Sequence, residues 1–178
     1  WSNNNNRKTG VPATIKSGMY YSDKIGKKTK LNGDYTFNQN QVWAGSETNT
    51  QFFLPDTAYT NFKTVSNYSK NQSHNFNFRI IQKLDSLTEL TLNPKVVLNK
   101  NETQSTQTDD FLTTENVKTR RTVITNDASS ETTNANIYMK LSRNFLKKDR
   151  NVSVTYQPIY NSGTGNTKYN TDFLFYTY

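Results

Sequence analysis

The residues whose types and spacing could support catalysis or ion binding are His74, the adjacent pair Asp109-Asp110 and the segment Gly163–Asn166. His74 is the only histidine, and no nucleophile motif accompanies it, so a catalytic triad is not predicted. The aspartate pair lacks the Asp/Asn/Gly spacing of a calcium loop. No helical pattern follows the GTGN segment, so it does not resemble a phosphate-binding loop. We therefore expect no enzyme, and we assign no catalytic, cofactor-binding or metal-binding residue.

The best candidates for ligand binding are aromatic side chains within the long polar stretch Gln41–Lys70. Such rings stack on sugars or peptides at a cell surface, pack on one another, or form an aromatic girdle at the level of lipid headgroups. The candidate surface-loop ligand contacts are Trp43, Phe52, Phe53, Tyr59 and Phe62.

The element around which the chain is organised is Ser73–Lys100, which has two alternating arms joined by the polar turn Asp85-Ser86. Successive strand side chains point to opposite faces, so these arms predict an amphipathic β-hairpin. Each arm matches the ~9–11 residues that a tilted strand needs to cross a bilayer, whereas a globular strand has about 5–6. This length indicates that the apolar face meets lipid. That face comprises Phe76, Phe78, Ile80 and Leu84 on the first arm, and Leu90, Leu92, Pro94, Val96 and Leu98 on the second.

The composition of the chain is too polar for an ordinary two-layer domain. Of 178 residues, 32% are hydrophobic, against roughly 45–50% in globular domains. A one-layer sheet closed on itself resolves this shortage, because only alternate residues need be apolar. There is no cysteine, which excludes disulfides and thiolate metal sites. No apolar run approaches the ~20 residues of a transmembrane helix, and the absence of an initiator methionine or signal peptide suggests an excised piece.

The predicted fold is all-β, with antiparallel up-and-down strands that form part of a transmembrane outer-membrane β-barrel. The whole chain, residues 1–178, is expected to be a segment of one barrel domain. Short turns and long loops alternate, as in outer-membrane barrels. We expect strands over residues 13–21, 29–40, 73–84, 87–99, 132–145 and 151–160. The connections are expected to be a loop over residues 1–12, a turn over 22–28 and outward loops over 41–70 and 101–131. A further connection is expected after residue 160, with residues 173–178 at the start or end of another strand.

Four segments, in the same order, resemble the outer-membrane β-barrel family of Bacteroidota that is related to TonB-dependent receptors. Members similar to this chain have NYSDKWGKK-like turns, an FLPD-like loop piece, a hydrophobic arm that ends in KIDS, and a KKxR turn before an alternating strand. The segments are GMYYSDKIGKKTKLNGDYTFN, QFFLPDTAYTN, HNFNFRIIQKLDSLTELTLNPKV and LSRNFLKKDRNVSVTYQPIYN, which together reach from Gly18 to about Tyr160.

The resemblance implies a non-catalytic receptor or transporter in the cell outer membrane, with a role in nutrient uptake or surface binding. It implies periplasmic positions for Lys24–Lys28, Asp85-Ser86 and Lys147–Arg150. The plug, the TonB box and the regulatory domain of the family are not evident in this sequence. About six or seven strands are too few for a barrel of at least eight, so the expected partners are outer-membrane lipid, the remainder of the barrel or another barrel chain, and an outer-membrane protein complex.

Two other classes of protein remain as alternatives. The first is a secreted all-β binding module, such as an adhesin or lectin-like sandwich, in which the apolar faces pack on each other. The second is a basic sheet that binds single-stranded nucleic acid, suggested by a net charge of +8 and by aromatic residues that can stack on bases. Most tyrosines and phenylalanines share faces with leucine and valine, which favours a buried or lipid-facing position, so we expect no nucleic-acid partner.

Overall fold

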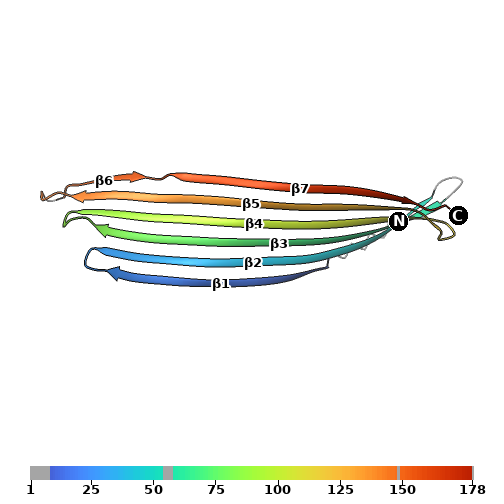
Figure 1. Ribbon diagram of the computed structural model, residues 1–178, viewed down its shortest axis with the longest axis horizontal. Coiled ribbons are helices and arrows are strands. Elements are labelled where there is room, and N and C mark those ends of the chain that lie inside the picture. The colour runs from blue at the N-terminus through green and yellow to red at the C-terminus, as the bar shows by residue number, and fades with distance from the viewer. Residues whose placement is uncertain (1–8, 54–57, 148, 178) are drawn as a thin grey trace.

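The computed structural model describes residues 9–53, 58–147 and 149–177. Regular structure in these ranges consists of β-strands and no helix (Figure 1). The prediction of an all-β, antiparallel, up-and-down sheet is confirmed. The strands are β1 (Thr9–Ile25), β2 (Thr29–Phe53), β3 (Ala58–Lys83), β4 (Thr88–Thr113), β5 (Lys118–Asn144), β6 (Asn151–Tyr156) and β7 (Ile159–Phe175).

The strands form one sheet in sequence order, and both β6 and β7 pair with β5. The two share one register, because Tyr156 lies opposite Met139 and Ile159 lies opposite Asn136. They therefore act as a single long edge strand that is interrupted at Gln157-Pro158 (Figure 1). Proline has no N–H to donate to a ladder and is tolerated at a sheet edge.

The four central strands are much longer than the sequence pattern predicted, with 25, 26, 26 and 27 residues. The prediction that residues 41–70 and 101–131 are loops was wrong, because strand pairing continues through most of both ranges. The described connection between β4 and β5 covers only residues 114–117. The physical reason is that both sheet faces are polar here, so no hydrophobic alternation marks the strands, although threonine favours β-structure.

Other predicted boundaries also shift. Residues 9–12, expected in a loop, begin β1, and β1 continues to Ile25, which reduces the first turn from 22–28 to residues 26–28. The residues after 160, expected to form a connection, belong to β7. The short turns around Asp85-Ser86 and Lys147–Arg150 are confirmed in the described residues. The Leu54-Pro55-Asp56 motif and Lys148 lie outside the described residues.

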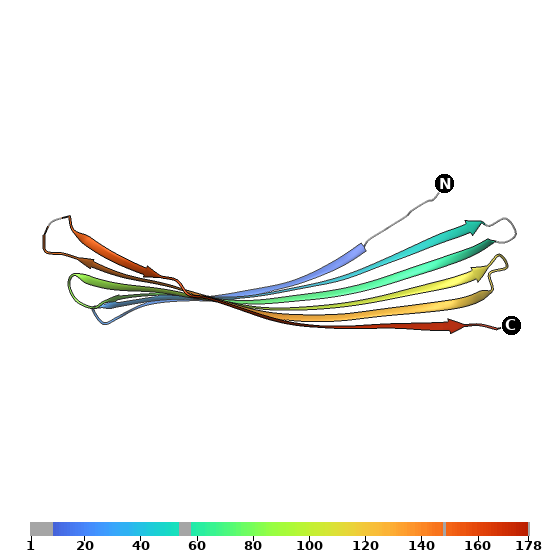
Figure 2. The same ribbon diagram turned by 90° about the horizontal axis from the view of Figure 1, so that it is seen from above.

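The described sheet is a single twisted layer, which Figure 2 shows from above with the strands converging and then fanning out. No hydrophobic residue in the described ranges is buried. Large apolar side chains are open to the surroundings; Met19, for example, is 71% exposed. Right-handed strand twist explains the shape. The described residues form one layer and not the two packed layers that a sandwich requires.

The two faces of the sheet differ in chemistry. We call "band face" the face that contains the apolar side chains of the predicted hairpin, and "polar face" the opposite one. One cross-strand row on the band face shows the pattern, since each neighbouring strand contributes one apolar residue. The row is Met19, Tyr35, Phe76, Val96, Ala135 and Tyr160.

The two ends of the sheet also differ. We call "turn end" the end with the β1–β2, β3–β4 and β5–β6 turns, and "apical end" the end with the connections after β2 and β4. At the turn end, the carboxylate of Asp85 accepts hydrogen bonds from the backbone N–H groups of Leu87 (2.7 Å) and Thr88 (2.8 Å). These bonds hold the pKa of Asp85 below its usual value. Gly26 has a φ of +64°, which glycine adopts without steric penalty.

Candidate functional site

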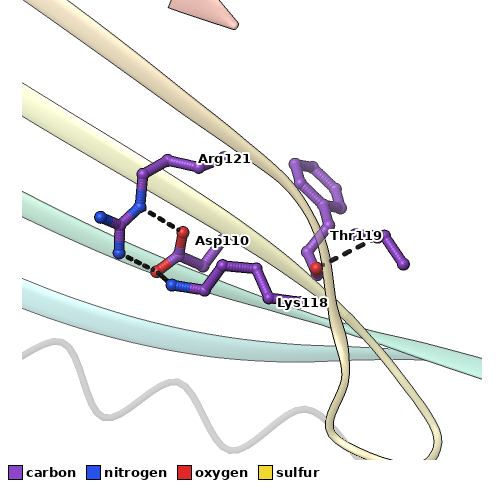
Figure 3. A network of polar contacts seen from close by, with 5 residues as sticks. Asp110, Lys118, Thr119 and Arg121 are labelled. Atoms are coloured by element: carbon purple, nitrogen blue, oxygen red, sulfur yellow. Dashed lines mark hydrogen bonds and ion pairs between the residues drawn. The ribbon is translucent and has the colours of Figure 1, made fainter. Parts of the chain in front are cut away.

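The apical end of the sheet contains the strongest polar cluster in the described residues (Figure 3). Arg121 of β5 donates two hydrogen bonds to the carboxylate of Asp110 of β4, at 2.7 and 2.8 Å. The ammonium group of Lys118 donates a third, at 2.9 Å. The register of β4 and β5 shifts between Phe111 and Leu112, which is the irregularity that brings Lys118 to the same carboxylate.

The electrostatics of this cluster favour the ionised carboxylate. Hydrogen bonds from Arg121 and then Lys118 lower the pKa of Asp110 from 3.8 to about 2, against the opposing effect of partial burial. Asp110 in turn raises the pKa of Arg121. All three groups are therefore charged at neutral pH. The cluster stabilises the β4–β5 hairpin at the apical end. Both carboxylate oxygens of Asp110 are paired with cations, so Asp110 is not placed to act as a free acid or base.

We predict that Asp110→Asn destabilises the apical hairpin at pH 7 by roughly 1–2 kcal/mol, since a charge-assisted ion pair is lost where water partly screens it. The folded-state pKa is depressed, so the stabilisation is complete above about pH 4 and declines as pH falls through about 2. Urea unfolding of both proteins at pH 7 and pH 2 should show the difference shrink in acid. Asp109→Asn is the control, and an undiminished Asp110 effect at pH 2 would contradict this assignment.

A second cluster lies on the polar face of the same end. The rings of Phe52 and Tyr59 stack, with centroids 4.6 Å apart and planes inclined by 14°. Tyr59 also lies near Phe111, at 6.2 Å. The guanidinium of Arg120 lies over the Phe111 ring, 3.9 Å from its centroid, which is cation–π geometry. Neighbouring strands β2 to β5 thus contribute one ring or cation each.

The five predicted aromatic candidates do not form one site. Phe52 and Tyr59 lie opposite each other on the polar face, as their alternation and register require. Trp43, Phe53 and Phe62 occupy the band face. Trp43 packs against Tyr68 with ring centroids 5.2 Å apart, which is one of the alternatives considered for these rings. Sequence reasoning therefore identified part of the polar-face cluster but combined it with residues that point the other way.

The remaining candidates have structural positions. His74 Nδ1 lies 2.8 Å from the Tyr35 hydroxyl, and its ring packs near Phe37. Asp109 and Asp110 point to opposite faces, so they cannot share an ion. The described residues contain no group of three or more acids or histidines placed to hold a metal. Gly163 and Gly165 are paired in β7 opposite Thr132 and Ser130, and the segment forms no loop.

A hollow in the described surface lies at the turn end, far along the strands from both apical clusters. It has a volume of about 650 Å³ and lies beside the turn that follows β5, with Leu87, Phe145 and Val152 among its lining. It is the gap beside a hairpin turn in a one-layer sheet. Its lining also includes the charged residues Arg143, Lys147, Asp149 and Arg150, which form no ion pair within the described residues. The apical clusters hold their polar and aromatic side chains in direct contact, so we place the candidate site at the apical end.

No protein-family model matches the chain, and no curated protein matches its sequence. Membership of the outer-membrane β-barrel family that the sequence resembles is therefore a proposal.

Sequence reasoning missed Phe111 and Arg120 as members of the polar-face cluster. Both lie in the range 101–131, which was predicted to be a loop. The available signal was Phe111-Leu112, an apolar pair in an otherwise polar stretch, followed eight residues later by the arginine pair Arg120-Arg121. Only the pairing of β4 with β5 places Phe111 opposite Arg120.

Proposed function

We propose that this chain is a segment of an outer-membrane β-barrel receptor or transporter of the TonB-dependent type, without catalytic activity. The single observation that supports this most strongly is the apolar band on one face of a one-layer sheet. In β4 the band runs from Leu90 to Leu98 at alternate positions, and residues on the opposite face are mostly polar. Nine residues are about the length that a tilted strand needs to cross a bilayer.

The band is oblique to the cross-strand rows, which is a second supporting observation. Its apical limit in β1 is Val11, which shares a row with Gln104 of β4. Its apical limit in β7 is Tyr160, which shares a row with Val96, eight positions away along β4. At ~3.3 Å per residue and ~4.8 Å between strands, this drift over five strand steps corresponds to a tilt of roughly 45°. Strands of outer-membrane barrels tilt by about 35–45°.

The apical side of the band has the features of a lipid–water boundary. Trp43 and Tyr68 pack together there on the band face, and such rings concentrate at the headgroup level. In β4 the residue that follows the band on this face is Lys100, which forms ion pairs with Glu102 (3.2 Å) and Glu131 (3.4 Å). From here to the apical end both faces are largely polar, which fits strands that extend beyond the membrane into water.

The open edges of the sheet explain why the remainder of a barrel is needed. The outer edge of β1 and the outer edge of β6 and β7 pair with no strand in the described part of the chain. In hydrocarbon, each unpaired backbone group costs several kcal/mol. The expected partners are therefore outer-membrane lipid and further strands of the same barrel or of another barrel chain. No helix in the described residues is long and apolar enough to cross a membrane.

The polar face becomes the inner wall of the barrel in this proposal. Near the turn end this wall is basic, and two acids, Asp34 and Glu89, lie among its cations. Asp34 accepts a hydrogen bond from Asn77 (2.8 Å). A positively charged wall attracts anionic solutes and acidic polypeptide segments, which supports a receptor or transporter role. The cations, placed by strand alternation, are Lys24, Lys30, Arg79, Lys83, Lys95 and Lys140.

The test is cell fractionation of the full-length protein that contains this segment. We expect it to sediment with the outer membrane, to require detergent for extraction, and to migrate faster on unheated than on heated denaturing gels, because a closed sheet resists detergent unfolding. Recovery as a detergent-independent soluble protein would overturn the proposal and favour the secreted binding module. A second layer, from outside this chain, would then have to cover the band.

A further inference from the structure

We propose that the apical part of the polar face binds an acidic oligosaccharide. This inference rests on the proposed receptor function and specifies the ligand class of its inner wall. The site is formed by side chains from β2, β3, β4, β5 and β7. They are Phe52, Tyr59, Asn61, Phe111, Arg120 and Phe175.

The register assembles these side chains into two adjacent cross-strand rows. Phe52 lies opposite Tyr59 in the first row. In the second, Asn61 lies opposite Phe111, Phe111 opposite Arg120, and Arg120 opposite Phe175. The site therefore spans four steps between neighbouring strands, roughly 20 Å at ~4.8 Å per step. This breadth suits an extended ligand with several rings better than a single small ring.

The rings retain surface for a ligand. Phe52 is 39% exposed and Phe175 is 72% exposed, although both lie on the face that is otherwise polar. An aromatic group that is exposed on a water-filled inner wall gains nothing from lipid or from a core. Flat, weakly polar ring faces stack favourably on the C–H faces of sugars, which explains aromatic residues at this position.

The charge of Arg120 selects for acid. Its neighbour in sequence, Arg121, is held by two hydrogen bonds to Asp110 on the other face. Arg120 forms no ion pair within the described residues, and its Nε is buried without a hydrogen-bond partner. Asp109, on the same face, accepts a hydrogen bond from Gln107 (2.6 Å) instead. A guanidinium held against an aromatic ring without an anion is suited to bind a ligand carboxylate in a forked geometry.

Asn61 places a polar side chain on the other side of Phe111 from Arg120. Its side-chain Oδ1 is buried and also lacks a hydrogen-bond partner. Asn61 and Arg120 flank Phe111 in the same row, so an unpaired acceptor and an unpaired donor border one ring. A ligand with ring faces and carboxylates matches the exposed aromatic rings and the guanidinium that has no ion pair in the described part of the chain, and a uronate-containing oligosaccharide has this combination.

The test is calorimetric titration of the full-length barrel protein in detergent with tetragalacturonate and, separately, with the neutral maltotetraose. We expect tetragalacturonate to bind at least tenfold more tightly. Arg120→Gln should weaken tetragalacturonate binding by about tenfold or more, since a charge-assisted contact is lost, and should reduce the preference over maltotetraose. Phe52→Ser and Tyr59→Ser should each weaken both ligands.

The matched control is Phe62→Ser, which removes an aromatic ring at the same end of the sheet but on the band face. Its binding should equal that of the unmodified protein. Equal loss in Phe62→Ser and Phe52→Ser, an unchanged affinity in Arg120→Gln, or no binding of tetragalacturonate would each overturn the proposal.

Heat-dependent gel migration of every variant reports separately on the barrel. A variant that migrates as a folded barrel but has lost affinity supports the site. If the unmodified protein behaves as a folded outer-membrane barrel and does not bind tetragalacturonate, the ligand proposal fails while the proposed function stands. If the protein is not a membrane barrel at all, fractionation shows this before any titration, and both proposals fail.

Discussion

Arginine in place of Ile80 or Leu92 is expected to destabilise the membrane-inserted protein by roughly 2–4 kcal/mol, the cost of a cationic side chain on the lipid face near the bilayer midplane. The two residues lie opposite each other on β3 and β4, in the middle of the apolar band. The measurement is reversible urea unfolding of the full-length protein in lipid vesicles. This substitution tests the band directly, because the penalty exists only if the band face contacts hydrocarbon.

The control for the arginine substitutions is Thr91→Arg, one residue from Leu92 and on the polar face. We expect a loss of at most about 1 kcal/mol, because a side chain on a water-filled inner wall remains hydrated. Asn77 is a less suitable control, since its amide donates a hydrogen bond to Asp34 that substitution would also remove. Equal penalties at Leu92 and Thr91 would argue for a soluble sandwich or for a different strand register.

Single cysteines at the two ends of the sheet are expected to react in an all-or-none manner on intact cells. The natural sequence contains no cysteine, so each introduced thiol is the only one in this segment. A cysteine replacing Glu115, in the apical β4–β5 connection, should react with a membrane-impermeant maleimide. A cysteine replacing Lys27, in the β1–β2 turn, should react only after the cells are lysed. In the proposed topology the short turns of the turn end face the periplasm, as in outer-membrane barrels, and the strands that continue beyond the apolar band reach the cell exterior at the apical end.

This labelling experiment fixes the orientation on which the ligand proposal depends. Both replaced side chains are exposed, so access to the reagent and not burial decides the result. Reaction of the Lys27 position alone on intact cells would invert the topology. The aromatic and cationic cluster would then face the periplasm, and a role in binding extracellular ligand would be excluded.

The open, one-layer form of the sheet also bears on the alternative of a secreted sandwich. A sandwich buries the inner faces of two sheets against each other. Here all seven strands belong to one sheet, and no hydrophobic residue in the described ranges is buried. Nothing in the described residues covers the apolar band. Under the proposed function lipid covers it, and the polar face borders an aqueous interior.

The sequence by itself determined the part of the sheet that contains the apolar band. Where one face is apolar and the other polar, alternation at period two marks the strand and its orientation, as in the arm that contains Phe76 and Ile80. The short turns could also be predicted from local sequence. Gly26 adopts the positive φ of its turn, and the Asp85 carboxylate accepts a backbone hydrogen bond within its own turn. The antiparallel up-and-down order followed from those turns.

Tertiary structure alone decided the apical half of the sheet and its clusters. Where both faces meet water, asparagine, threonine and serine occupy both, and no period-two signal separates a paired strand from a loop. Strand pairing with neighbours supplies the missing constraint, since each strand satisfies the backbone groups of the next. The pairing of β4 with β5 places Arg120 on the polar face over Phe111 and Arg121 beside Asp110 on the other face, and the register shift at Phe111/Leu112 brings Lys118 to the same carboxylate.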